Sequence, residues 1–387
     1  MMLGVCALLF IPLPPSKGEP PRLATQRSKA EVHPWSEERR NPKQPKPNSP
    51  FEGGRGDDHQ STNRKQPEPN TMKKILVTGG AGFIGSNLVD ALLADERISF
   101  VRVLDNLSTG FEENISQHHY NPKFEFLEAD IRDFDNCLRA CNGMDLVSHQ
   151  AALGSVPRST QDPLTTNAVN ISGTLNILHA AKESGIKRIV YASSSSAYGD
   201  SPALPKIEDK IGKPLSPYAV TKYVNELYAS VYARTFGMEV IGLRYFNVFG
   251  PRQSPNGAYA AAIPLFISKL QNGESPTING DGSNSRDFTY VANAVLANLL
   301  ALFCENNAAL GEVFNIAFGQ QTTLLEMFEI LRKELKVDTK AVFGPERLGD
   351  IPYSLASIEK AQRILGYFPK VSVAEGLKRT VEWHSMK

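Results

Sequence analysis

The sequence has few cysteines, and their spacing excludes two kinds of small stabilising site. Only four occur among the 387 residues, namely Cys6, Cys137, Cys141 and Cys304. None forms a Cys-x-x-Cys pair and no histidine cluster accompanies them. Neither a disulfide framework nor a zinc site is therefore expected. This pattern fits a reducing compartment, so we expect a cytoplasmic protein that holds no metal.

Net charge and long hydrophobic runs are also lacking. The 42 lysines and arginines almost balance the 41 aspartates and glutamates. This balance gives no reason to expect a nucleic-acid partner or an acidic membrane surface. No apolar run reaches the ~18–20 residues that a membrane-spanning helix needs. The apolar content of 41% is ordinary for a globular protein.

Residues 1–71 differ in composition from the rest of the chain. From about residue 14 onward Pro, Lys, Arg, Glu, Asn, Ser and Gly dominate. Such a segment cannot bury enough apolar surface to offset its ordering entropy, so we predict disorder. The opening run, Met1–Leu13, is apolar like part of a signal peptide, but no Lys or Arg precedes it and prolines replace the cleavage site. We hypothesise that the true start is Met72, which N-terminal sequencing of native protein would test.

From Met72 onward, short apolar strands alternate with amphipathic helical segments. This alternation predicts an α/β fold, a Rossmann-type doubly wound parallel sheet covered by helices on both faces. The predicted strands are 75–77, 101–104, 124–128, 146–149, 188–192 and 240–244.

A glycine-rich turn follows the first predicted strand. Gly79, Gly82 and Gly85 are spaced three apart, and an apolar-periodic helical segment comes next. Glycines let the backbone take positive φ and approach a ligand closely. The free N–H groups at the start of the next helix favour a diphosphate. Because the second strand ends at Asp105, where a dinucleotide fold holds ribose hydroxyls, the stretch predicts dinucleotide binding.

A candidate catalytic group follows the fifth strand. Four serines, 193–196, stand at the strand end, and Ser216 is a good N-cap for a helix that starts at Pro217. Tyr218 and Lys222 are then four residues apart on one helix face. A neighbouring ammonium favours the phenolate, so we expect the pKa of Tyr218 to lie below its usual value. Such a phenol can act as general base or acid on a substrate hydroxyl.

Taken together, residues 72 to about 385 resemble the extended short-chain dehydrogenase/reductases, a family of NAD-dependent epimerases and dehydratases. The resemblance rests on the glycine turn, the strand ends and the Tyr218/Lys222 pair, and it implies NAD as cofactor. The residues assigned to cofactor binding are Gly79, Gly82, Phe83, Ile84, Gly85, Asp105, Asn106, Asp130, Ile131, Gln150, Ala151, Ala152, Asn170, Tyr218 and Lys222.

Within that family the resemblance favours a nucleotide-sugar epimerase. The catalytic hydroxyl of such epimerases lies four residues before the Tyr of a Tyr-Gly pair, which gives Ser194 here. The 4,6-dehydratases and decarboxylases carry acidic residues just after this position, where Ser195 and Ser196 stand in this chain. Without those carboxylates elimination is hard to support, so epimerisation is expected.

The resemblance also assigns residues to a UDP-sugar substrate. Asn247 and Arg286 would contact phosphate, Arg347 the diphosphate and Asp350 the ribose. The loop that contains Gly154 is similar to that of UDP-N-acetylglucosamine 4-epimerases from bacterial polysaccharide pathways. The remaining substrate-binding predictions are Gly154, Ser155, Ser194, Ser195, Ser196, Ala261 and Ser354, the last leaving space for an N-acetyl group.

We therefore expect an NAD-dependent 4-epimerase that interconverts UDP-GlcNAc and UDP-GalNAc. The alternative is a 4-epimerase of UDP-GlcNAcA or of UDP-glucose/galactose. A third hypothesis is a non-catalytic NAD or nucleotide-sugar binding protein. The intact Tyr218, Lys222 and Ser194 argue against this third hypothesis. The predicted division is an NAD-binding domain, 72–246, and a smaller substrate lobe, 247–387, from which about 291–317 return to the sheet. The family expectation is a homodimer.

Overall fold

The computed structural model describes residues 72–255, 261–346 and 352–386, all within one unit of the chain, Gln66–Lys387. The predictions made for residues 1–71, and for Arg347 and Asp350, lie outside the described residues. Among those described, no helix is both long enough and apolar enough to cross a membrane.

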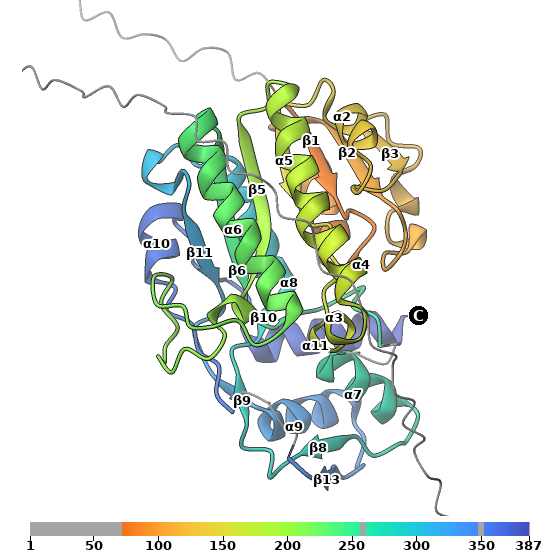
Figure 1. The fold of residues 1–387 in the computed structure, drawn as a ribbon. Coiled ribbons are helices and arrows are strands. Elements are labelled where there is room, and N and C mark those ends of the chain that lie inside the picture. Colours follow the sequence, from red (N-terminus) through yellow and green to blue (C-terminus); the bar gives the residue numbers. More distant parts are fainter. Residues whose placement is uncertain (1–71, 256–260, 347–351, 387) are drawn as a thin grey trace, which may run out of the picture. The chain divides into compact units, whose positions relative to one another are not determined.

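A seven-stranded sheet forms the centre of the described chain, and every neighbouring pair in it is parallel (Figure 1). The strand order is β11-β6-β5-β4-β1-β2-β3. The order reverses between β1 and β4, which is the switch point of a doubly wound fold. The predicted Rossmann-type fold is confirmed. The strands are β1 (Lys73–Thr78), β2 (Ile98–Asp105), β3 (Phe124–Glu128), β4 (Leu146–His149), β5 (Arg188–Ser194), β6 (Glu239–Tyr245) and β11 (Val313–Ile316).

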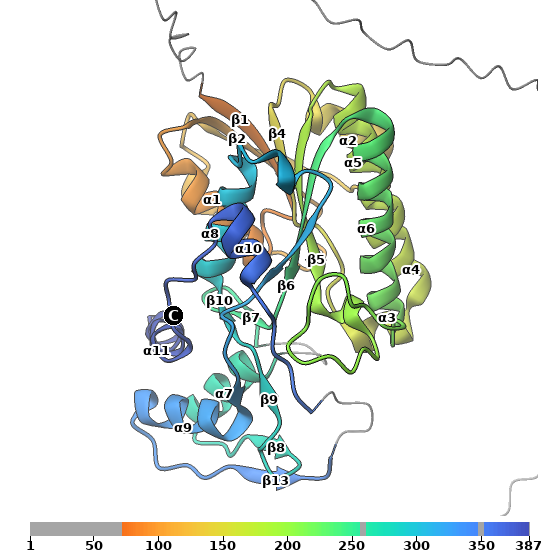
Figure 2. The same cartoon turned by 90° about the vertical axis from the view of Figure 1, so that its left-hand side faces the viewer.

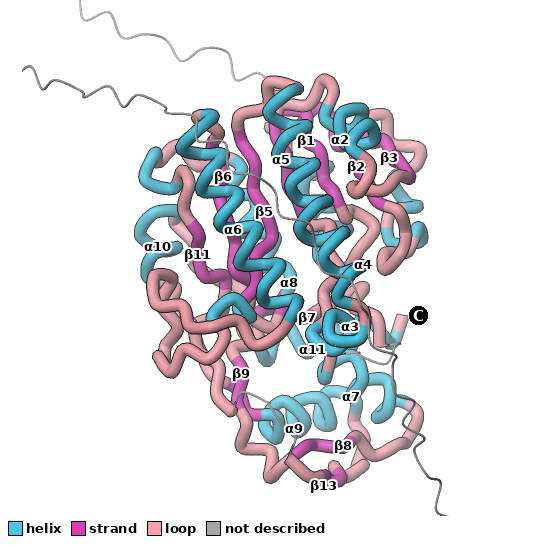
Figure 3. Tube along the Cα trace, viewed as in Figure 1, coloured by secondary structure: helices cyan, strands magenta, loops and turns pink. Residues whose placement is uncertain are grey.

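Helices cover both faces of this sheet (Figure 2). One group consists of α2 (Phe134–Cys141), α5 (Thr174–Glu183) and α6 (Pro217–Phe236), and the other of α1 (Phe83–Leu93), α8 (Val291–Leu302) and α10 (Glu359–Leu365). The tube view separates these helices from the strands between them (Figure 3).

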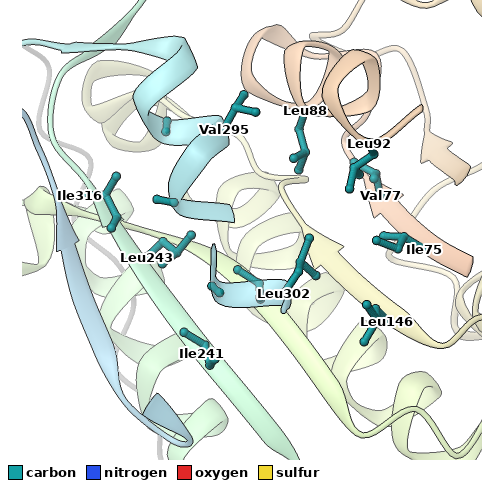
Figure 4. Packing of buried hydrophobic residues seen from close by; sticks show 14 of the residues in the cluster. Ile75, Val77, Leu88, Leu92, Leu146, Ile241, Leu243, Val295, Leu302 and Ile316 are labelled. Carbon is teal, nitrogen blue, oxygen red and sulfur yellow. The ribbon is translucent and has the colours of Figure 1, made fainter. Parts of the chain in front are cut away.

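The strand residues alternate between the two cores, as the pleat requires. Ile75 and Val77 pack with Leu88 and Leu92 of α1 (Figure 4). Leu76, which lies between the two β1 residues, belongs to the other core with α2 and α5. Strands buried on both faces explain why the sequence shows continuous apolar runs rather than a polar alternation.

The helix that carries the candidate catalytic pair begins where the sequence indicated. The Ser216 side chain accepts a hydrogen bond from the Ala219 N–H at 3.1 Å, and Pro217 occupies the first turn. Gly237 ends the helix with φ +63°. A side-chain N-cap of this kind stabilises a helix by about 1 kcal/mol. The cap therefore defines where α6 starts, immediately before Tyr218.

The remaining regular elements lie around the central sheet or belong to a separate core. Around the seven-stranded sheet lie α3 (Val156–Gln161), α4 (Pro163–Asn167), a π-helical turn (Ala168–Gly173) and 3₁₀ turns at Glu112–Asn114, Ser116–His118, Ser195–Tyr198 and Asn307–Ala309.

A separate core joins α7 (Ala262–Gln271), α9 (Leu324–Leu335) and α11 (Val373–Ser385). Three two-stranded sheets accompany it: β7 (Val248–Phe249) with β10 (Thr289–Tyr290), β9 (Ser285–Arg286) with β12 (Thr322–Thr323), and β8 (Thr277–Asn279) with β13 (Val342–Gly344).

Candidate active site

A cavity of about 570 Å³ lies beyond the carboxyl ends of the central strands. This is where ligands bind in doubly wound sheets. Most of the predicted site residues line it, although they are spread over nearly 170 positions of the sequence. Those that do are Gly79, Gly82, Phe83, Ile84, Gly85, Asp105, Asn106, Asp130, Ile131, Gln150, Ala151, Ala152, Gly154, Ser155, Ser194, Ser195, Tyr218, Lys222 and Asn247.

The glycine turn leaves no room for side chains at two of its positions. Gly79 has φ +70°, and a Cβ built on it would lie 2.6 Å from the Ala151 nitrogen. A Cβ on Gly85 would lie 2.1 Å from the Gly79 oxygen. The turn therefore packs directly against the segment that follows β4, and the first residues of α1 line the cavity.

Asp105 ends β2 and joins that strand to the glycine turn. Its carboxylate accepts hydrogen bonds from the Ala81 N–H at 3.0 Å and the Leu107 N–H at 2.9 Å. Burial raises the pKa of Asp105, although these backbone hydrogen bonds oppose the rise. The carboxyl group is thus held at the strand end, where it can accept hydrogen bonds from a ribose.

Asp130 lies at the neighbouring strand end with both oxygens occupied. The Asn106 amide donates to it at 2.8 Å, and the Arg132 guanidinium pairs with it at 2.7 Å. The Arg132 hydrogen bond lowers the pKa of Asp130 to about 2, so this carboxylate is ionised at neutral pH.

Asn170, which was predicted to bind the cofactor, forms hydrogen bonds behind the wall of the cavity. Its amide oxygen accepts from the Leu153 N–H at 2.8 Å, and its amide nitrogen donates to the Leu153 carbonyl at 3.2 Å and to the Thr221 hydroxyl at 3.1 Å. Asn170 is fully buried and does not line the cavity. Within the described chain it joins the cavity wall at Leu153 to α6.

Tyr218 and Lys222 lie together at the cavity, with the Lys222 nitrogen 5.9 Å from the Tyr218 ring centre. Burial raises the pKa of Tyr218, and a hydrogen bond with Ser194 opposes the rise without cancelling it. The pKa direction predicted from the sequence is therefore wrong for the protein by itself. The reason is that burial disfavours the charged phenolate. Lys222 donates to the Ala192 carbonyl at 2.8 Å, and burial lowers the pKa of Lys222 itself to about 8.

The serine run forms a directed chain of hydroxyl groups. The Ser196 hydroxyl donates to the Ser194 oxygen at 2.9 Å, and the Ser196 N–H donates to the same atom at 3.1 Å. Because Ser194 accepts both bonds, its own proton is free for the Tyr218 oxygen with which it is paired. Ser195 lines the cavity, whereas Ser196 does not and acts through Ser194.

The catalytic end of the cavity carries no carboxylate among the described lining residues. The two acids in the lining, Asp105 and Asp130, follow β2 and β3. Three strand spacings separate β2 from β5, which bears Ser194, so Asp105 lies about 14 Å away along the sheet. An acid at the position of Ser195 or Ser196 is therefore not replaced by one from elsewhere in the lining.

A second cavity of about 280 Å³ adjoins the first. Ala261 and Arg286 line it, as predicted for substrate-binding residues, and Asn247 borders both cavities. The Asn247 backbone is left-handed, with φ +37°, a conformation that asparagine tolerates. Ser354 lines neither cavity, and its N–H donates to the Ser285 carbonyl at 3.1 Å.

Gln253 and Tyr245 are among the lining residues that the sequence reasoning missed. Gln253 borders both cavities, and its amide donates to the Val248 carbonyl at 3.2 Å while its amide oxygen is buried without a protein partner. Tyr245 ends β6 opposite Ser194 and donates to the Gln150 amide oxygen at 3.1 Å. Its place at a strand end was the signal that could have identified it.

The parallel sheet, the glycine turn and the cavity at the strand ends define a dinucleotide-binding protein of the doubly wound α/β class. The model of the NAD dependent epimerase/dehydratase family matches residues 75–317. The chain belongs to this family, and its chemistry is that of NAD-dependent nucleotide-sugar 4-epimerases and dehydratases.

Three relatives illustrate the match. The chain is 40% identical to a UDP-N-acetylglucosamine 4-epimerase from Methanobrevibacter ruminantium, solved in complex with UDP-N-acetylmuramic acid, with a TM-score of 0.77 over 82% of this chain and 99% of that one. It is 36% identical to the Thermus thermophilus UDP-glucose 4-epimerase in complex with NAD, with a TM-score of 0.72 over 81% and 99%. A UDP-glucose 4-epimerase of Mycolicibacterium smegmatis is 38% identical over 81% of this chain and 99% of its own length.

NAD is the cofactor, and the described residues fit it. Gly79 and Gly85 leave the close backbone approach that a diphosphate needs. Asp105 stands where a ribose hydroxyl pair would be held. In the described lining of the first cavity, the one of about 570 Å³, Lys222 is the only cationic side chain. No described lining residue beside Asp105 would therefore neutralise the extra phosphate of NADP.

Proposed function

We propose that the chain is a 4-epimerase of a UDP-N-acetylhexosamine that interconverts UDP-GlcNAc and UDP-GalNAc. The observation that carries the proposal is the convergence of Ser194, Tyr218 and Lys222 at a cavity whose catalytic end has no described carboxylate. Epimerisation needs one group to move a proton at the 4-hydroxyl. Dehydration needs further acid and base groups, which this part of the lining does not offer.

The glycine turn, Asp105 and the segment Gln150–Ala152 would hold NAD. When bound, NAD supplies the reversible oxidation at the sugar C4. A dissociating nicotinamide cofactor would have to be regenerated by another reaction, whereas a retained one is restored within each epimerisation cycle.

Tyr218 would remove and return the proton of the 4-hydroxyl. Its pKa lies above the usual value in the protein alone, so it needs stabilisation of its phenolate. The Ser194 hydroxyl provides one hydrogen bond, and the positive charge of Lys222 provides a second contribution when the lysine is protonated. With a sugar bound, the Ser194 proton could be donated to the sugar oxygen in place of the Tyr218 oxygen, because the Ser196 hydroxyl and N–H already occupy the acceptor sites of Ser194.

The space beside Gly154 supports an acetylated substrate. A Cβ built on Gly154 would meet nothing within 4 Å, and this residue lines the cavity beside Ser155. An N-acetyl group needs such open volume. The predicted contribution of Ser354 has no support from the cavity lining, so the argument for N-acetyl rests on Gly154 and on the sequence resemblance.

Plain UDP-glucose or a UDP-N-acetyluronic acid is the second candidate. UDP-glucose is the substrate named for two of the three relatives above. A uronic acid would need a cation for its carboxylate, and Arg286, in the second cavity, is the described arginine nearest to that role by its position.

The test is incubation of the purified protein with UDP-GlcNAc, and separately with UDP-glucose and UDP-GlcNAcA, followed by proton NMR of the sugar. Conversion of UDP-GlcNAc to UDP-GalNAc, with UDP-glucose slower, is expected. Conversion of UDP-glucose alone would keep the mechanism and overturn the substrate. A matched variant, Gly154→Tyr, should depress turnover of UDP-GlcNAc more than that of UDP-glucose, because it fills the space assigned to the acetyl group.

We also propose a cytoplasmic location, a homodimer, and a division into a domain of residues 72–246 and a lobe of residues 247–387. Each follows from the sequence and the family, and the homodimer is tested below.

A further inference from the structure

A buried ion pair lies directly behind the catalytic residues. Glu226 is in α6, one turn after Lys222 and two turns after Tyr218. Its carboxylate receives two hydrogen bonds from Arg244 of β6, from Nε at 2.8 Å and from Nη2 at 2.7 Å. The side chains are only 6% and 3% exposed, so water does not share in these bonds.

The same carboxylate also binds the end of β5. The Ser193 hydroxyl donates to Glu226 Oε1 at 2.5 Å, and Ser193 directly precedes Ser194 in the strand. Arg244 is the register partner of Ser193 across β5 and β6. Glu226 therefore connects α6 to both strands at the level of the catalytic serine.

The Arg244 guanidinium also contacts the segment between β5 and α6. Nη1 donates to the Glu208 carbonyl at 2.8 Å, and the guanidinium carbon lies 4.8 Å from the Tyr198 ring centre. Burial alone would lower the pKa of Arg244, but the hydrogen bonds and charge of Glu226 raise it above the usual value. The Arg244 guanidinium is thus charged, and its two bonds to Glu226 are directional, with planar bidentate geometry.

Lys222 makes the second connection between α6 and β5. Its nitrogen donates to the carbonyl of Ala192, the residue before Ser193. Two consecutive β5 residues are therefore bound by two side chains that lie one helical turn apart. A helix held at two such points can neither rotate nor slide along its axis relative to the strand.

We propose that the Glu226–Arg244 pair is a positioning element that fixes Tyr218 and Lys222 of α6 in register with Ser194 of β5. The inference rests on the proposed roles of those three residues in proton transfer. A displacement of about 1 Å between reacting groups can reduce a rate about 100-fold. Neither Glu226 nor Arg244 lines the cavity, so the pair acts through α6 and β5 rather than on the substrate.

A role of the Glu226–Arg244 pair in positioning can be distinguished from a contribution of the pair to stability. A buried ion pair adds little net stability compared with apolar side chains of similar volume, whereas removal of one partner leaves an unpaired buried charge. Replacement of both partners, Glu226→Leu with Arg244→Met, should therefore keep the fold while it removes the directional connection.

The matched control is the pair Arg188–Glu239, at the other end of the same two strands. These residues are register partners in β5 and β6 and pair at 2.7 Å. The variant Arg188→Met with Glu239→Leu makes the same chemical change away from the catalytic residues.

The experiment compares the two double variants with the wild-type enzyme. For the Glu226/Arg244 double variant we expect kcat to fall about 100-fold with the KM for the UDP-sugar changed by less than about threefold, because the misplaced groups act in the transition state. The control should keep kcat within about twofold. Equal kcat values in the two folded variants would overturn the proposal.

A readout without substrate keeps the inference separate from the proposed function. In protein labelled with ¹³C-tyrosine, the Tyr218 resonance, identified by its loss in Tyr218→Phe, reports the pKa of the phenol. Because the Ser194 hydrogen bond lowers that pKa, its loss in the Glu226/Arg244 double variant should raise the pKa relative to wild type, and the control should not change it. An unchanged pKa in the folded double variant contradicts the inference even if the natural substrate is a different sugar.

Ser193→Ala supplies a milder variant in case the double replacement does not fold. It removes only the hydroxyl that joins β5 to Glu226, and it leaves the ion pair intact. We expect kcat to fall about tenfold and the melting temperature to fall by a few degrees, because a buried hydrogen bond to a carboxylate is lost, whereas wild-type kcat would overturn the positioning role.

Discussion

At the scale of single residues, the described site depends on hydrogen-bond direction. Ser196 donates to Ser194, which leaves the Ser194 proton for Tyr218. Lys222 donates to a strand carbonyl and is buried, so its charge is less available to the phenol than the sequence spacing alone suggests. Burial and the Ser194 hydrogen bond therefore determine the direction in which the pKa of Tyr218 is shifted, rather than one adjacent charge.

Tyr218→Phe removes the proposed proton carrier and keeps the ring. We expect kcat to fall by about 10²–10⁴-fold, which is the usual contribution of a positioned general acid or base. NAD binding, measured by isothermal titration on the same samples, should change by less than about threefold. Near-normal turnover in this variant would contradict the assigned role of Tyr218.

At the scale of elements, the turn between β1 and α1 and the start of α6 are local structures that the sequence specifies well. The glycine positions are fixed by φ and by the absence of space for a Cβ at Gly79 and Gly85. The start of α6 is fixed by the Ser216 cap. Both features bring backbone or side-chain groups to the same edge of the sheet.

Two glycine variants separate a glycine that the backbone requires from one that it does not. Gly79→Ala should weaken NAD binding at least tenfold and lower the free energy of unfolding by about 1–3 kcal/mol, because the positive φ is strained for alanine and the new Cβ would overlap Ala151. Gly154→Ala, whose Cβ meets nothing within 4 Å, is the control and should leave NAD binding and stability nearly unchanged. Calorimetric titration with NAD and urea unfolding measure the two effects.

At the scale of the whole described chain, two features predict behaviour of the entire molecule. One is a buried aspartate that joins distant segments, and the other is an exposed apolar row on α6. Asp287 is joined to two distant segments because it accepts the backbone N–H groups of the neighbouring residues Phe318 and Gly319 and of Ala356 at 3.0–3.1 Å. α6 presents an apolar row, Val220, Leu227 and Val231, each more than 40% exposed. The first feature predicts a pH dependence of stability, and the second predicts an association.

Asp287 should make the protein more stable as the pH falls from about 7 to about 4. Burial raises the pKa of Asp287 to about 6, above the ~3.9 of an unfolded chain, so the folded state binds the proton more tightly. Full protonation adds up to about 3 kcal/mol to the free energy of unfolding, a gain that is complete below the unfolded pKa and lost as the pH rises through about 6.

Urea unfolding of wild type and Asp287→Asn across this range checks the sign. The wild-type protein should be the more stable at pH 7, because asparagine cannot accept all three backbone N–H groups, and the gap should widen as the pH falls. Asp281→Asn, the same change at an exposed loop aspartate, should show no widening. A gap that stays constant or narrows for Asp287 would refute the linkage.

The exposed row on α6 fits association of two copies through this helix, as proposed for a homodimer. Leu227→Glu with Val231→Glu should convert the dimer to a monomer, because two like charges would be buried in each apolar contact. Light scattering after size-exclusion chromatography measures the mass. Leu325→Glu on α9, another exposed apolar position, is the control and should leave the mass unchanged. A wild-type monomer would contradict the proposal directly.

The sequence by itself determined the local features of this protein and their order along the chain. Four of these features depend on residues close in sequence, and each is present in the structure. They are the alternation of strands and helices, the glycine turn, the Ser216 cap and the Tyr218/Lys222 spacing. The family assignment followed from these same motifs because their spacing is specific.

Only the tertiary structure decided how these groups act on one another. Burial reversed the expected pKa direction of Tyr218, and hydrogen bonds to Leu153 and Thr221 gave Asn170 a role in the fold rather than in the cavity lining. The junction of Glu226, Arg244 and Ser193 joins one helix to two strands. Desolvation and long-range pairing depend on which segments meet in space, and no local pattern in the sequence contains that information.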